Sequence, residues 1–118
     1  MRSVLIPSQQ MGRFQQVVQG GLGRVLAKQG RYEEARRVLK ESLAKPDRRQ
    51  RTHALISLGI TARGEGKNAE AQEILVRGLA MAEEMGDRPA QSEFLAELGF
   101  TAIQHGETTL AQSYFSRA

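Results

Sequence analysis

The apolar positions of this chain follow one pattern three times. Each copy has a Leu-Gly step, a glycine eight residues after that leucine, an alanine thirteen residues after it, and a large apolar residue four positions later. The positions are Leu22, Gly23, Gly30, Ala35 and Leu39; Leu58, Gly59, Gly66, Ala71 and Leu75; and Leu98, Gly99, Gly106, Ala111 and Phe115. Successive copies are 36 and 40 residues apart. A pattern repeated at such a period is typical of stacked repeat proteins.

Apolar residues at helical spacing predict two helices in each copy, and therefore an all-α fold. The predicted helices cover residues 11–29, 32–44, 48–63, 68–85, 88–105 and 108–118. Asp47 and Asp87 are expected to cap the third and fifth helices, and Asn68 and Thr108 the fourth and sixth. Gly86 suits the left-handed residue that follows a helix.

The repeated positions have a packing explanation. A glycine after each leucine lets a neighbouring helix approach closely, and the alanine on the second helix does the same from the other side. The leucines and the late Leu, Leu or Phe fill the space around this contact. The second glycine of each copy lies at the bend, where an unusual backbone angle is needed. Each pair is expected to bury its remaining apolar face only against the next pair.

This pattern, with the turn sequences at residues 30–35 and 66–71, resembles the tetratricopeptide repeat, a helix-turn-helix unit of about 34 residues. The resemblance runs from Gln16 to Ala118 and implies tandem antiparallel helix pairs, six helices in about three repeats, stacked as a right-handed α-solenoid. We expect residues 1–10 to form a flexible lead-in and residues 11–118 to form a single domain. Its repeats are expected at about 16–49, 52–87 and 88–118.

The second junction is longer than the family pattern because residues 80–87 extend the helix before it. This lengthened form resembles repeats in bacterial signal-transduction regulators, in ATPases and in peptide-sensing regulators. The family's proline near the repeat end is approximated only by Pro46.

The resemblance also implies a concave groove lined by the first helix of each pair. The groove positions carried over are Arg24, Lys28, His53, Ile56, Ile60, Arg63, Glu93, Glu97, Phe100, Ile103 and Gln104. This set is basic at one end and acidic at the other. It predicts an extended peptide or a partner helix with an apolar centre, held by Ile56, Ile60, Phe100 and Ile103. Alternatively, the isoleucines simply pack against neighbouring helices. The groove has no asparagine, which argues against a chaperone-tail adaptor.

Composition excludes several classes of function. The 118 residues contain no cysteine, so disulfides, thiolate metal sites and cysteine nucleophiles are excluded. The net charge is +4, but 13 acidic residues are interspersed among 17 basic ones, which makes a weak case for nucleic acid. No stretch approaches the length of a membrane span or a secretory signal, so a cytoplasmic location is the default.

No residue pattern predicts catalysis, a cofactor or a metal. His53 and His105 lie on different predicted helices with no second ligand at metal-binding spacing. The pairs Glu33-Glu34 and Glu83-Glu84 are adjacent, so their side chains point in different directions on a helix. We therefore predict a protein that is not an enzyme.

Two features leave a functional question open. Arg48, Arg49 and Arg51 form a basic cluster that could meet an acidic partner or phosphate, although an exposed helix start explains it as well. The last helix has no polar cap after it, so Leu110, Tyr114 and Phe115 are expected to be partly open. Either a second copy of the chain covers this end by self-association, or the chain is a fragment of a longer regulator.

The favoured hypothesis is a non-catalytic scaffold that binds a protein or peptide partner in the groove. The alternative is a segment of a bacterial transcriptional or signalling regulator that senses a peptide or a small molecule. Nucleic-acid binding through the basic cluster is a third and weaker hypothesis.

Overall fold

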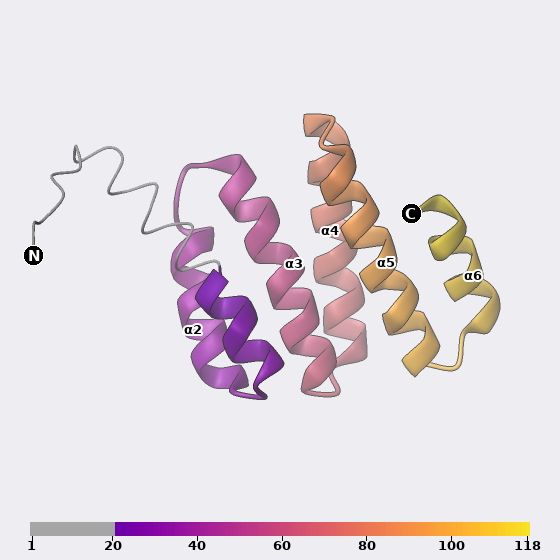
Figure 1. Ribbon diagram of the computed structural model, residues 1–118, viewed down its shortest axis with the longest axis horizontal. Helices are drawn as coiled ribbons and strands as arrows, with labels where there is room; N and C mark the ends of the chain where they lie inside the picture. Colours follow the sequence, from indigo (N-terminus) through magenta and orange to yellow (C-terminus); the bar gives the residue numbers. More distant parts are fainter. Residues whose placement is uncertain (1–20) are drawn as a thin grey trace, which may run out of the picture.

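The computed structural model describes residues 21–118 as an all-α helical repeat array, and these residues contain no strand. Residues 21–28 are helical and are followed by α2 (Tyr32–Leu43), α3 (Arg48–Gly64), α4 (Asn68–Met85), α5 (Arg88–Gln104) and α6 (Thr108–Arg117). Consecutive helices lie side by side in chain order along the long axis (Figure 1). The predicted lead-in and the start of the predicted first helix lie outside the described residues.

The turn within each pair has the same backbone geometry in all three units. Gly30, Gly66 and Gly106 have φ values of 78°, 79° and 75°, in the left-handed region that glycine tolerates. Each glycine N–H donates to the carbonyl three residues earlier, and the next N–H donates to the carbonyl five residues earlier. This is the Schellman motif, which satisfies the last carbonyls of the preceding helix. Gly86 ends α4 in the same way, as its position predicts.

The predicted aspartate caps are confirmed. Asp47 accepts hydrogen bonds from the backbone N–H groups of Arg49 and Gln50, and Asp87 accepts one from Ala90. Each bond satisfies a donor that the first helical turn leaves without an intrahelical partner.

The predicted Asn68 and Thr108 caps are wrong. Both residues are already helical, and the capping positions are Lys67 and Glu107, which make no side-chain capping bond. The glycine turn explains the difference, because it fixes the residue after the glycine at φ of −90° and starts the helix there. The helix therefore begins one residue earlier than the side-chain chemistry suggests.

Within each pair, the glycine of the Leu-Gly step faces the late apolar residue of the second helix. A methyl group at Gly23 would lie 2.5 Å from Leu39 Cδ2, and one at Gly99 would lie 2.6 Å from Phe115 Cε1. A methyl group at Gly59 would overlap Leu75 in the same way. Real Cβ atoms do not approach other atoms this closely, so only glycine permits the contact.

The core lies between successive pairs as well as within them. One cluster joins α3, α4 and α5 and includes Leu55, Leu75, Phe94 and Leu98. A second cluster joins residues 21–28, α2 and α3 and includes Leu26, Leu39 and Leu58. The repeat alanines Ala35, Ala71 and Ala111 are all buried. Ile74 packs against both clusters, so the core is continuous along the array.

The junction between the second and third units depends on another glycine. A methyl group at Gly78 in α4 would overlap the ring of Phe94 in α5, which is fully buried. At the first junction the equivalent positions are Ser42 and Ala54, two small residues that are both buried. At the second junction, the large Phe94 side chain thus packs against a glycine, which has no side chain to occupy the same space.

An ion network ties the first unit to the second. Arg36 in α2 pairs with Glu65, after α3, at 2.5 Å and with Glu70 in α4 at 2.9 Å. Hydrogen bonds from Arg36 lower the pKa of Glu70, against the opposing effect of partial burial. The hydrogen bonds that Arg36 donates to Glu70 and Glu65 also raise the pKa of Arg36, so the guanidinium keeps its charge.

Replacing Gly59 by alanine should destabilise the protein even though alanine favours helix by about 1 kcal/mol. Overpacking against the buried Leu75 should cost about 1–3 kcal/mol, so we expect a melting temperature several degrees lower in a thermal scan followed by circular dichroism. Gly21→Ala is the matched control, because no atom lies within 4 Å of the added methyl group. An unchanged or higher melting temperature for Gly59→Ala would show that the contact is not tight.

Acid should weaken the junction made by Arg36. Because the folded-state pKa of Glu70 is lowered from 4.5, its contribution is present above that value and is lost as the pH falls through the folded-state pKa. Urea midpoints measured across this acidic range should fall more steeply for the wild type than for Glu70→Gln. Parallel profiles for the two proteins would contradict this assignment.

Candidate functional site

A hollow of about 370 Å³ lies between residues 21–28 and the first half of α3. Its lining is contributed by Gly21, Arg24, Arg49, Gln50, His53, Ile56 and Ser57. The volume is at the lower end of the range of about 300–1,000 Å³ typical of ligand sites. Two guanidinium groups and an imidazole line it, together with an amide and a hydroxyl. The hollow can therefore accept an anionic group with neighbouring hydrogen bonds.

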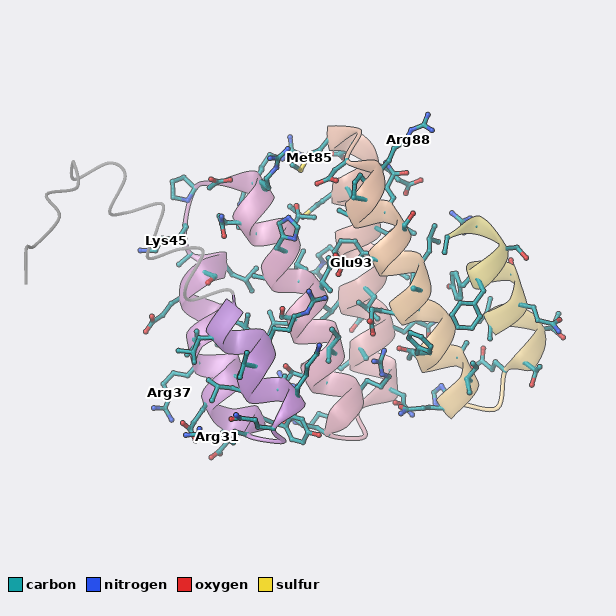
Figure 2. The ribbon with its side chains drawn as sticks, in the orientation of Figure 1. Arg31, Arg37, Lys45, Met85, Arg88 and Glu93 are labelled. Atoms are coloured by element: carbon teal, nitrogen blue, oxygen red, sulfur yellow. The ribbon has the colours of Figure 1, made fainter. Side chains whose placement is uncertain are left out.

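One of these cations, Arg24, already forms an ion pair with a carboxylate of the protein. Arg24 Nη2 donates to Glu93 Oε2 of α5 at 2.7 Å, although the two residues are 69 positions apart. Glu93 lies near the middle of the face shown in Figure 2. The Nε atom of Arg24 is buried and has no hydrogen-bond partner among the described residues. The predicted basic and acidic ends of the groove are thus joined by an ion pair from the first unit to the third.

A second ion pair links α3 to α5. Arg63 Nη1 lies 2.6 Å from Glu97 Oε2 and also donates to the Glu97 carbonyl at 3.2 Å. Both side chains are mostly buried, and the Arg63 guanidinium lies 5.7 Å from the ring centre of Phe100. Arg63 and Glu97 therefore hold the two helices together, and little of either side chain remains for a ligand.

The predicted apolar centre needs a correction at Ile56. Ile56 is only 1% exposed and belongs to the core cluster with Phe94 and Leu98, so it forms the floor of the hollow. For this residue the alternative reading, packing against neighbouring helices, is the right one. Ile60 is half-buried and packs against the same cluster. On α3, the first helix of the middle unit, these two apolar residues therefore contribute to the core.

The remaining predicted groove residues are exposed or partly exposed, but they do not meet in one place. Phe100 and Ile103 are exposed near α6, where the rings of Phe100 and Phe115 pack edge to face with centres 5.3 Å apart. Lys28 and Gln104 are exposed at the ends of their helices. The structure therefore separates the predicted groove into a polar hollow at the first junction and an apolar surface at the third unit.

Arg49 and Gln50 line the hollow, and the sequence-based groove omits both. Arg49, His53, Ile56 and Ile60 are spaced by four, three and four residues, which places them on one face of a helix. This spacing could have predicted that Arg49 lies on the same face as the groove residues of α3. Within the basic cluster, Arg48 instead pairs with Glu84 of α4 at 2.6 Å, on an exposed part of the surface.

No group of three or more metal-binding side chains occurs within residues 21–118. His105 Nδ1 lies 3.6 Å from Glu107 Oε1, beside the last turn, and His53 is exposed at the hollow. None of the described helices combines the length and the apolar character needed to cross a membrane.

Comparison with known proteins agrees with this geometry. The model of the tetratricopeptide repeat matches residues 16–41, which include the helical residues 21–28 and most of α2. This match supports a tetratricopeptide repeat at the start of the array. No curated protein and no solved structure matches the chain in the same comparisons.

The second and third units show the same features as the matched one. Each has the left-handed glycine, the buried alanine and the close contact between the Leu-Gly step and the late apolar residue. Tetratricopeptide repeats generally mediate protein–protein interactions and are generally not catalytic.

Proposed function

We propose that this tetratricopeptide array is a non-catalytic interaction module that binds an acidic segment of a partner protein in the hollow at its first junction. The observation that carries the proposal is the pairing of Arg24 with Glu93 beside a space lined by Arg49 and His53. The Glu93 carboxylate supports the proposal because it pairs with Arg24, one of the cations that line the hollow. A partner carboxylate could take the same place or bind beside it.

The charges and hydrogen-bonding groups at the hollow favour an acidic ligand over a neutral one. Arginine forms strong, directional hydrogen bonds with carboxylates. The buried Nε–H of Arg24 has no acceptor among the described residues, and an acceptor from a ligand would satisfy it. Gln50 and Ser57 can bind the backbone of an extended peptide, while Ile56 provides an apolar floor.

The proposal predicts a change in peptide preference when the charge of the hollow is reversed. A display library of short random peptides, selected on the wild type, should be enriched in sequences containing Asp or Glu. Arg49→Glu should weaken binding of the selected peptides by about 10-fold or more, since a charged hydrogen bond contributes about 1.5–3 kcal/mol. Fluorescence anisotropy with a labelled selected peptide would measure the loss.

Arg37→Glu is the matched control, because Arg37 is exposed on α2 and points away from the body of the array (Figure 2). It changes the net charge equally but leaves the hollow intact. Retention of the acidic preference in Arg37→Glu, together with its loss in Arg49→Glu, would support the site. Absence of any acidic preference in the wild type would overturn it.

A second candidate is that the array senses its ligand as part of a bacterial regulator. The observations that favour it are the lengthened α4, with 18 residues against 12 in α2, and the ion pair that crosses from the first unit to the third. A ligand carboxylate that takes Arg24 would release Glu93 and loosen the curvature of the array. Ligand binding would then change the shape of the array.

Small-angle X-ray scattering tests this second candidate without a ligand. Glu93→Gln removes the charge that holds Arg24, so we expect a larger radius of gyration than in the wild type. Glu73→Gln, an exposed change on α4, is the control and should leave the scattering unchanged. Identical scattering from all three proteins would exclude the ion pair as the element that sets the shape.

A further inference from the structure

Exposed apolar side chains gather at the two ends of the array. Six large hydrophobic residues are exposed among residues 21–118, and five of them belong to the first or the third unit. Leu22 and Val25 lie in the first unit, and Phe100, Ile103 and Phe115 lie in the third. Only Val76 lies elsewhere, on α4.

The five residues at the ends have more buried counterparts at the same repeat positions inside the array. Phe115 is 36% exposed, whereas Leu75 at the same repeat position is 0% exposed because α5 packs over it. Leu22 is 44% exposed, whereas Leu98 is 1% exposed against the preceding unit. The two ends therefore present the two halves of a contact that the array already makes between its own units.

We propose that a second copy of this chain covers these residues, with the first-unit face of one copy stacked on the third-unit face of the next. The internal junctions supply the template for this head-to-tail contact. At the second junction Arg63 of α3 meets Glu97 of α5, and the corresponding end positions are Ile103 and Gly21. An apolar side chain would thus meet a residue without a side chain, and no charge would be left unpaired there.

Other positions at the ends are compatible with the same register. Arg36, which pairs with Glu65 and Glu70 at the first junction, corresponds to Gln112 in the third unit. Gln112 would face Gln29 and Glu34 of the next copy, so no like charges meet. A contact between unlike faces leaves one free face on each end of a dimer, so further copies add, as a ring or an open stack, and the assembly should grow with concentration instead of stopping at a dimer.

The experiment uses two variants, each of which blocks one face. Val25→Lys places a charge on the first-unit face, and Ile103→Arg places on the third-unit face the residue type found at its internal counterpart, Arg63. Both positions are at least half exposed, so both variants should fold, which circular dichroism checks. Val76→Lys is the matched control on α4, away from both faces.

Light scattering across a wide concentration range should give an average mass for the wild type and for Val76→Lys that rises above 13.1 kDa. Val25→Lys alone and Ile103→Arg alone should remain at the mass of one chain. An equimolar mixture of the two should give a complex of two chains, because each variant retains the face that the other has lost.

Two results would overturn the proposal. A wild-type mass of one chain at every concentration would show that no second copy covers these faces. Association of Val25→Lys alone, together with no complex in the mixture, would show a contact between two identical faces instead of the head-to-tail one.

Discussion

The close approach of two helices at a glycine is the interaction on which each repeat depends. Gly23, Gly59 and Gly99 leave space that Leu39, Leu75 and Phe115 fill, and a methyl group in any of these places would overlap the partner. The two helices of a pair therefore make their closest approach at this glycine. This contact fixes how the two helices pack. The turn between them then requires a left-handed glycine, and the alanine of the second helix is buried.

The junctions between pairs are less uniform, and this variation gives the array its surface features. The equivalent positions at the first junction hold small buried residues, whereas Phe94 fills the space left by Gly78 at the second. Ion pairs add to the apolar contacts: Arg36 spans the first junction and Arg63 the second, while Arg24 reaches across both to Glu93. The hollow lies where the first unit meets α3. Its cationic side chains are Arg24 and Arg49.

The repeat spacing predicted the fold well because the same physical requirement recurs three times. The helix pairs, the Asp47 and Asp87 caps and the left-handed Gly86 follow from local chemistry that the sequence shows directly. Asn68 and Thr108 misled because the turn geometry, not a side chain, starts those helices. The site was harder to predict: the burial of Ile56 and the pairing of Arg24 with Glu93 depend on how closely successive units stack, which no single repeat reveals.

Nuclear Overhauser effects between the Gly59 Hα protons and the Leu75 methyl groups would test the central contact most directly. The account predicts strong effects here and in the equivalent pairs Gly23 with Leu39 and Gly99 with Phe115, because the closest atoms leave no room for a methyl group. If α3 and α4 were helical and adjacent but these effects were absent, the glycine contact would not be what holds the pair together.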